Sequence, residues 1–383
     1  MGKAVKKIFV LAILLSGIAS GLSARAQIFG ELIADYRAYL NPEGKYEIVY
    51  TPVPPDPFLW EIDGSAGFNK FDVRRMLVGY HKDISENALA EVAIRIGETD
   101  EEGREVLLDR AYFQLSNPDS LYYEFKFGYF QTPGLEWTRN NFWQWDMFEY
   151  PMLEYLGLVS RSQMGVSLGA GVRLSQFETG LGGGFFNGGY LDDDDFDQYL
   201  AFWTARLSLE KFSASSIIGY TLNGEKEKEG YQELWQYGLG LTIPYFNLGG
   251  EYFSGRGWIP AGEAYILGRW PDGMEQYLAL AGRALFEDKY INYYGFCLSA
   301  DFQPIKSLHI IYRYDLFDPS ERFDDDKQNL NLFGVVYELT SQVRLGASYQ
   351  EQDFQSHKLP ISGGEIKIEP FQILSLSLQA KLP

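Results

Sequence analysis

Apolar and polar residues alternate one by one along much of this chain. The clearest stretch is Gln163–Ser175, in which every even position from Met164 to Leu174 is apolar and every odd position is polar or glycine. Successive side chains of a β-strand point to opposite faces. One face of this strand would therefore suit lipid and the other water, as in the strands of a membrane barrel. The pattern recurs at positions 88–97, 308–317, 343–350 and 374–382.

Short and long connections alternate between the predicted strands. The short ones include residues 83–87, 117–120, 210–212, 244–246, 303–306 and 339–342. The long ones are residues 41–65, 98–105, 132–160, 187–197, 223–231, 255–289, 318–326 and 355–365. Short periplasmic turns and long external loops are typical of outer-membrane barrels. Eight long loops and seven short turns predict an all-β, closed antiparallel barrel of sixteen strands, with both termini on the periplasmic side.

The stretch Gly255–Lys289 leaves the strand number open. Residues 264–268 and 277–285 would form an extra hairpin across the turn at Pro271-Asp272-Gly273, giving eighteen strands. Residues 275–286 would alternatively form a short helix within a long loop, because Met, Leu and Ala favour helix. Sixteen strands is the preferred interpretation.

The N-terminus has the layout of a secretory signal peptide. A short apolar run at 8–15 follows a basic segment and precedes Ala24-Arg25-Ala26, the small-x-small pattern of a cleavage site. The run is too short for a membrane span, which needs roughly 20 residues. The sequence thus predicts a signal peptide at 1–26 and a single outer-membrane barrel domain at 27–383, exported to the outer membrane of a Gram-negative bacterium. The basic residues are Lys3, Lys6 and Lys7.

Composition supports a barrel and excludes other classes. The chain holds 27 Tyr, 27 Phe, 8 Trp and 40 Gly, which suits strands with alternate lipid-facing residues. The net charge of −19 argues against a nucleic-acid partner. Cys297 is the single cysteine, so no internal disulfide forms. The acidic runs at 192–195 and 324–326 are interpreted as solvated loops, with weak Ca²⁺ or Mg²⁺ binding as the alternative.

Motifs for catalysis are missing from the sequence. There is no His-Glu-x-x-His zinc motif, no phosphate-binding glycine loop and no nucleophile elbow. The histidines His81, His309 and His357 fall in unrelated stretches, so none is an obvious base for a nucleophile. We therefore expect no enzyme activity, no cofactor and no metal site.

The long loop Thr132–Ser160, closed by Arg161, is the main candidate site. A loop of this length inside a compact domain is usually functional or disordered, and this one is too rich in aromatic residues to be disordered. We expect it to fold inward and constrict the pore. The alternative is an external loop that packs against a neighbouring subunit or lipid headgroups. Its candidate constriction residues are Glu136, Trp137, Arg139, Trp143, Trp145, Asp146, Glu149, Glu154 and Arg161.

Alternation also predicts which charged side chains face the lumen. The basic ones are Arg95, Arg110, Lys126, Arg173, Arg206, Arg313 and Arg344. Acidic residues predicted on the same face are Glu91, Glu124, Glu178, Asp301 and Asp315. Rings of charge in a pore select ions by sign. The same residues could instead pair with one another and keep the lumen wet.

Four segments carry a resemblance to a known family. The segment Phe127–Glu136, FGYFQTPGLE, is similar to the G-x-F-K-T-P-x-G-L-E segment of the phosphate-selective porin O and P family. The other three similar segments are Phe71–Arg75, Arg161–Val166 and Arg313–Pro319. The resemblance implies a sixteen-stranded trimeric porin that passes small solutes, lined by arginine and lysine in the members that select phosphate. Gln131 stands where that family often has lysine.

Together these features predict an outer-membrane porin. It would form a water-filled channel for passive diffusion of small hydrophilic solutes, with anions such as phosphate among the candidates. One alternative is an aromatic-lined channel for sugars or other organic solutes. Another is a non-conducting surface adhesin or structural barrel. The expected partners are outer-membrane lipid, lipopolysaccharide, two further copies in a homotrimer, and the solutes themselves.

Overall fold

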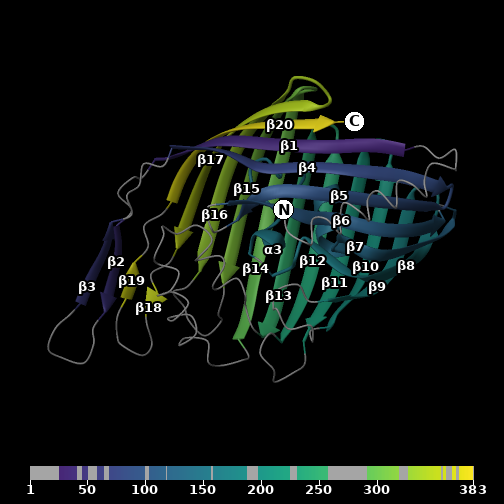
Figure 1. The fold of residues 1–383 in the computed structure, drawn as a ribbon, viewed down its shortest axis with the longest axis horizontal. Helices are drawn as coiled ribbons and strands as arrows, with labels where there is room; N and C mark the ends of the chain where they lie inside the picture. The colour runs from purple at the N-terminus through teal and green to yellow at the C-terminus, as the bar shows by residue number, and fades with distance from the viewer. Residues whose placement is uncertain are drawn as a thin grey trace.

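The fold is a closed antiparallel barrel with a smaller sheet at one end (Figure 1). The computed structural model describes residues 26–40, 45–50, 58–63, 69–99, 103–117, 119–156, 158–187, 197–224, 231–257, 291–318, 327–354, 357–358, 365–367 and 371–382. The barrel strands are Ala26–Tyr39 (β1), Asn69–Ser85 (β4), Ala88–Thr99 (β5), Gly103–Asn117 (β6), Leu121–Gln131 (β7), Ser162–Arg173 (β8), Phe177–Asn187 (β9), Asp197–Leu209 (β10), Phe212–Asn223 (β11), Gln232–Ile243 (β12), Phe246–Gly257 (β13), Ile291–Ile305 (β14), Leu308–Asp318 (β15), Gln328–Glu338 (β16), Val343–Phe354 (β17) and Phe371–Leu382 (β20).

The barrel of the described residues has sixteen strands and closes between its first and last members. Each strand pairs with its neighbours in the chain, and β1 pairs with both β4 and β20. In the register, Ala26 lies opposite Lys82 and Gly30 opposite Leu382, so both ends of the barrel chain lie near the short turns. The predicted sixteen-stranded fold and its alternation of short and long connections are confirmed.

The pairing of β13 with β14 decides between sixteen and eighteen strands. The two strands are bonded along their whole length, from Phe246 opposite Phe302 to Gly257 opposite Ile291. No further hairpin is inserted between them, so the eighteen-stranded barrel is wrong. The predicted helix at 275–286 lies outside the described residues.

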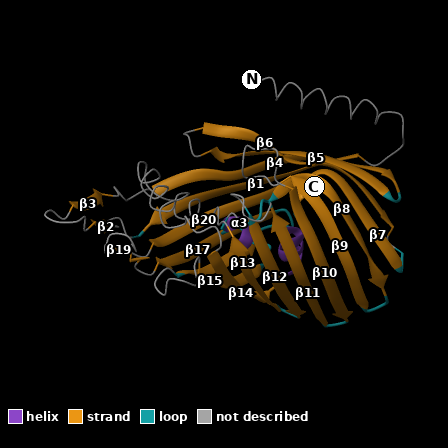
Figure 2. Cartoon of the chain, turned by 90° about the horizontal axis from the view of Figure 1, so that it is seen from below, coloured by secondary structure: helices purple, strands orange, loops and turns teal. Residues whose placement is uncertain are grey.

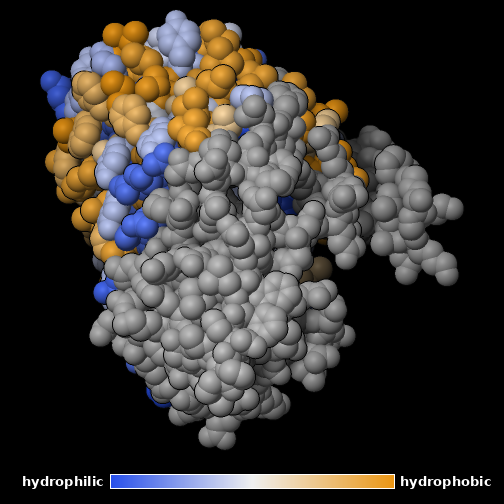
Figure 3. Space-filling model, turned by 90° about the vertical axis from the view of Figure 1, so that its left-hand side faces the viewer, coloured by the Kyte–Doolittle hydropathy of each residue, from blue (hydrophilic) through white to orange (hydrophobic). Residues whose placement is uncertain are grey.

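The two faces of the wall differ in polarity as the alternation predicts. Large apolar side chains such as Leu168, Leu181 and Leu239 are more than half exposed on the outer face. Figure 3 shows apolar residues gathered on the outer barrel surface. Alternate residues of the same strands, such as Gln163 and Ser167, are buried inside. In the described part of the chain, no helix is long and apolar enough to cross a membrane.

The first and last long loops contain a second sheet that the sequence interpretation missed. Its strands are Lys45–Tyr50 (β2), Phe58–Asp63 (β3), His357–Lys358 (β18) and Glu365–Lys367 (β19), in the order β18-β19-β2-β3. The pairing of β19 with β2 places Ile366 opposite Ile48, so the sheet joins loops from the two ends of the chain. The alternation in Lys45–Tyr50 is only six residues long, which is too short to be recognised as a strand without its partner.

Candidate pore-constriction site

The loop between β7 and β8 is closed at its neck by two hydrogen bonds. The backbone N–H of Thr132 donates to the carbonyl of Arg161 at 3.0 Å, and the Thr132 hydroxyl donates to the carbonyl of Ser160 at 2.6 Å. Helix Pro133–Asn141 (α2) begins at once, with proline in its first turn, where a missing N–H costs nothing. These two bonds thus continue the β7–β8 pairing and hold the two ends of the long loop together.

The loop folds into the interior of the barrel and is not an external loop. Its two helices, α2 and Met152–Tyr155 (α3), lie within the ring of strands (Figure 2). Helix α2 contacts β11 and β12. One buried cluster joins the loop to the inner wall of β12 to β15. Its members from the loop are Leu135, Met152, Leu153, Leu156, Leu158 and Val159, and those from the wall are Leu234, Phe253, Tyr293, Cys297 and Phe317.

A second buried cluster extends the packing of the loop along the wall, from β15 and β16 to β1. Its members are Trp143, Trp145, Met147 and Phe148 of the loop with Ile33, Ile311, Leu332 and Val336 of the strands. Trp143 is 1% exposed and Trp145 is 2% exposed. Two of the tryptophans predicted to constrict the pore are therefore anchors that hold the loop to the wall.

Glycines of the wall provide recesses for the aromatic residues of the loop. A methyl group at Gly238 would lie 2.4 Å from the ring of Trp137, and one at Gly334 would lie 2.6 Å from the ring of Phe148. At Gly249 the added carbon would lie 2.1 Å from Phe142. Real carbon atoms do not approach so closely, so a larger residue at these positions would displace the aromatic side chains of the loop. The inward glycines thus define where the loop is seated.

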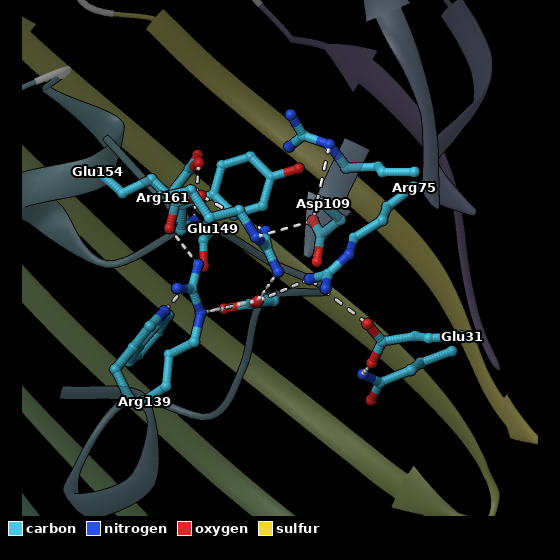
Figure 4. Close-up of polar contacts among 12 residues, drawn as sticks. Glu31, Arg75, Asp109, Arg139, Glu149, Glu154 and Arg161 are labelled. Carbon is cyan, nitrogen blue, oxygen red and sulfur yellow. Dashed lines mark hydrogen bonds and ion pairs between the residues drawn. The ribbon is translucent and has the colours of Figure 1, made fainter. Parts of the chain in front are cut away.

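The charged residues of the loop form a network with arginines and acids of the wall (Figure 4). Asp146 lies at its centre. Its carboxylate is 3.1 Å from Nη1 of Arg75 on β4, 3.1 Å from Nε of Arg139 on α2, and 4.0 Å from Nη2 of Arg161. Although burial raises the pKa of Asp146, the three arginines outweigh that effect and hold the pKa below its ordinary value.

Further carboxylates complete this network. Arg161 lies 3.4 Å from Glu154 and 3.5 Å from Asp109 on β6, and Arg139 is also paired with Glu154 (Figure 4). Arg75 additionally lies 3.4 Å from Glu31 on β1. Each of the three arginines therefore lies beside at least one carboxylate, and each of the four carboxylates lies beside at least one arginine. The network ties the loop to β1, β4 and β6, the side of the barrel opposite to its apolar anchors on β12 to β15.

Arg313 is sealed beneath the loop. Its guanidinium lies 2.8 Å from Asp315, donates to the carbonyl of Tyr150 at 2.7 Å and stacks 4.4 Å from the ring of Trp143. The side chain has no exposed surface. It faces inward as predicted but does not line a water-filled passage. Glu149 is likewise buried, and its carbonyl accepts the indole N–H of Trp143 at 2.7 Å.

The carboxyl of Glu251 on β13 is buried beneath α2. It accepts hydrogen bonds from Gln236 and from the hydroxyl of Thr138, the latter at 3.2 Å. Its second oxygen has no hydrogen-bond partner. Gly134 makes this contact possible, because a methyl group there would lie 2.4 Å from the Gln236 amide oxygen. The helix is thus held to the wall by a polar contact as well as an apolar one.

Most of the predicted lumen-facing basic residues are paired with carboxylates. The pairs are Arg95–Asp109 at 4.0 Å, Arg110–Glu91 at 2.7 Å, Lys126–Glu136 at 3.1 Å, Arg173–Glu178 at 2.9 Å, Arg313–Asp315 and Arg344–Glu338 at 2.8 Å. Arg206 lies opposite Glu178 in the β9–β10 register and is exposed. These contacts favour the interpretation in which the charges pair with one another over the interpretation in which they form a ring of one sign.

Sequence reasoning missed several residues of the site. Arg75, Asp109 and Glu31 belong to the network, and Gln236 and Glu251 hold α2. Alternation in β4 could have placed Arg75 inside, because Met76 and Val78 point outward. Asp109 sits beside a register shift in the β5–β6 pairing, where simple alternation fails. Among the described residues, no group of three or more His, Cys, Asp or Glu is placed to hold a metal ion.

Comparison with known proteins shows a shared barrel fold and does not assign the chain to a family. No protein-family model matches this chain, and no curated protein sequence matches it. The fold is similar to OprB of Pseudomonas putida, with a TM-score of 0.59 at 11% identity over 93% of this chain and 94% of that one. It is also similar to Salmonella typhi OmpF, with a TM-score of 0.57 at 9% identity over 93% of this chain and 97% of that one.

A third similar structure is the outer membrane channel DcaP of Acinetobacter baumannii. Its TM-score is 0.56 at 10% identity, over 95% of this chain and 99% of that one. At such low identity these likenesses show a shared barrel fold. The sequence resemblance to the phosphate-selective porin O and P family therefore stays a prediction.

Proposed function

We propose that this chain is an outer-membrane porin that lets small hydrophilic solutes diffuse passively through the barrel. The observation that carries the proposal is a closed barrel of sixteen strands, apolar outside and polar inside. Barrels of this size are wide enough to leave an aqueous channel. The similar fold of DcaP, an outer membrane channel, supports the same function.

The loop Thr132–Ser160 is the proposed constriction of that channel. It packs against β12 to β15 on one side and reaches β1, β4 and β6 through its charged network on the other. A loop that crosses the interior narrows the passage, and solutes would have to pass beside the exposed parts of its charged side chains. Glu136, Arg139, Glu154 and Arg161 would line this passage, with Asp146 buried at the centre of their network, whereas Trp143, Trp145 and Glu149 hold the loop in place.

The pairing of charges bears on which solutes pass. A pore that selects anions needs positive charge that its own carboxylates do not neutralise. Among the described residues, the predicted inward basic residues other than Arg206 lie beside carboxylates, and Arg206 is exposed. We therefore propose a pore with weak charge preference, which would carry neutral solutes as readily as anions such as phosphate. The reversal potential in a salt gradient distinguishes this from an anion-selective pore, which would give a large potential of fixed sign.

A liposome-swelling series tests the transport function. Proteoliposomes would be diluted into isosmotic sugars, neutral amino acids and phosphate, with protein-free liposomes as the control. Swelling that slows as the solute grows larger is expected of a passive pore. Absence of swelling with every small solute would favour the alternative of a non-conducting adhesin or structural barrel.

The cellular setting is proposed with the function. The apolar outer face would contact outer-membrane lipid and lipopolysaccharide, and the acidic loops would lie outside the cell. Residues 1–26 would act as a signal peptide cleaved on export, although residues 1–25 lie outside the described residues. The protein would assemble as a homotrimer, as implied by the family resemblance. Mass measurement of the mature N-terminus and of the detergent-solubilised assembly checks both points.

A further inference from the structure

A hollow of about 310 Å³ lies in the wall formed by β6 to β10, close to the short turns. The side chains that matter are Gln114, Tyr122, Glu124, Arg173, Glu178 and Phe202, and we call this region the β6–β10 hollow. In β8 the outward residues Leu168 and Val172 are exposed, so Arg173 projects inward. Glu178 lies opposite Arg173 in the register and shares its face. The hollow therefore opens to the lumen.

Glycines create the hollow, and aromatic rings lie on them. A methyl group at Gly182 would lie 2.3 Å from Cζ of Phe202 and 2.7 and 2.8 Å from its two Cε atoms. These nearly equal distances place the ring flat over the glycine. A methyl group at Gly171 would lie 2.6 Å from Cζ of Tyr122, whose ring is covered in turn by Arg173 at 5.2 Å. Phe202 thus has one face on the wall, and the other faces the hollow.

The polar rim of the hollow is charged, but its charges are matched. Arg173 holds Glu178 through two bonds, at 2.9 and 3.1 Å. Gln114 donates to Glu124 at 3.0 Å, and Lys126 lies 3.3 Å from the same carboxylate. The side chains of Glu124 and Glu178 are still 42% and 33% exposed. Their remaining oxygen lone pairs can accept hydrogen bonds from a solute.

We propose that the β6–β10 hollow is a low-affinity binding site for neutral, ring-shaped polyhydroxylated solutes, that is, sugars of one or two rings. The apolar face of a sugar ring would lie on Phe202, and its hydroxyl groups would donate to Glu124 and Glu178. A free anion would meet these two carboxylates, and a cation would have to compete with Arg173 and Lys126. The volume is at the lower end of the roughly 300–1,000 Å³ range of ligand pockets, which suits a small solute.

This inference rests on the proposed function, because the solute would reach the hollow through the pore. The test is the conductance of reconstituted protein while maltose is added, with sorbitol as a hydroxyl-rich control that lacks a ring. We expect a saturable fall in conductance with maltose alone. Phe202→Ala should raise the half-saturating maltose concentration by about five-fold, the scale of one aromatic contact. Phe185→Ala, which removes a neighbouring ring on the outer face, should leave it unchanged.

A second variant and a second measurement separate the two proposals. Glu178→Gln should also weaken the maltose effect, because it removes an acceptor and releases Arg173. An equal fall in conductance with maltose and sorbitol would overturn the sugar site. So would a Phe202→Ala variant with an unchanged half-saturating maltose concentration. Either result would leave the proposed porin function intact. If no channels form, the porin function fails instead. Calorimetry of maltose with the detergent-solubilised protein and its Phe202→Ala variant then decides the site without conductance, and absence of binding overturns it.

Discussion

Phe142 of the inward loop sits so close to Gly249 of β13 that a methyl group on the glycine would lie 2.1 Å from Phe142 Cβ. The contact is between a loop residue and the backbone of the wall, and backbone cannot move aside as a flexible side chain can. The position of the loop therefore depends on the absence of a side chain at 249. At Gly334 the nearest atom to an added methyl group is a ring carbon of Phe148, at 2.6 Å.

Substitution of Gly249 tests this seating. Gly249→Val should destabilise the protein by about 1–3 kcal/mol, the usual range for overpacking, and should change single-channel conductance because the loop is displaced. The temperature at which the folded barrel loses its faster migration on a gel measures the first effect. Gly250→Val is the matched control, because the nearest atom to its added carbon belongs to the flexible side chain of Leu298, at 3.1 Å. Phe142→Gly in the Gly249→Val background removes Phe142 Cβ and should restore part of the stability, and a failure to do so would contradict this account of the contact.

Removing the central carboxylate of the network should make the pore more favourable to anions. Asp146→Asn leaves Arg75, Arg139 and Arg161 with one negative charge fewer. One unit charge at 4 Å is worth about 1 kcal/mol in water, so the anion-to-cation permeability ratio should rise about five-fold. The reversal potential in a KCl gradient reports the ratio. Glu86→Gln, in an exposed turn, is the control for loss of one charge elsewhere, and an equal shift in both variants would refute a special role for Asp146.

The acid dependence of the network follows from the lowered pKa of Asp146. A carboxyl whose pKa is lower in the folded state contributes stability above its ordinary value, which is 3.8, and that contribution is lost as the pH falls through the folded-state pKa. The wild-type melting temperature should therefore keep this contribution from neutral pH down to about pH 4 and lose it at lower pH. Asp146→Asn should lack this acid-labile component. Parallel profiles for the two proteins would show that Asp146 does not contribute it.

The buried pair of Arg313 and Asp315 should be more sensitive to mutation than an exposed pair. Asp315→Asn leaves the guanidinium of Arg313 buried without its carboxylate, which typically costs about 3–5 kcal/mol. Arg173→Gln breaks a pair whose side chains are 45% and 33% exposed, and such exposed pairs contribute about 0–1 kcal/mol. Urea-induced unfolding in lipid vesicles gives both values. Equal effects in the two variants would mean that the loop does not seal Arg313 from water.

The barrel could be predicted from the sequence because lipid and water impose an alternation at every strand. Residues 163–175 show it in full, and the strand count follows from the alternation of short and long connections. The inward direction of Lys126, Arg173 and Arg344 follows from the same rule. Local sequence is sufficient for these features, because each depends on which face of one strand a residue occupies.

The seating of the loop could not be predicted, since it depends on strands that are distant in the chain. Trp143 and Trp145 look like pore-lining aromatics until the wall residues beneath them, such as Ile311 and Leu332, are known. Arg313 has the alternation of a water-facing residue, and only the fold shows that Trp143 covers it. The inward glycines of β12, β13 and β16 were the available signal, because a row of missing side chains on a lumen wall marks where something else packs.

Planar-bilayer recording of the purified, folded protein tests the central claim most directly. Addition to one side of the membrane should produce discrete, voltage-tolerant conductance steps of uniform size, since each inserted barrel provides a water-filled path. Protein unfolded by heating before addition should produce none. Well-inserted, folded protein that gives no conductance steps would contradict the porin function, and the barrel would then be a non-conducting structural or adhesive protein.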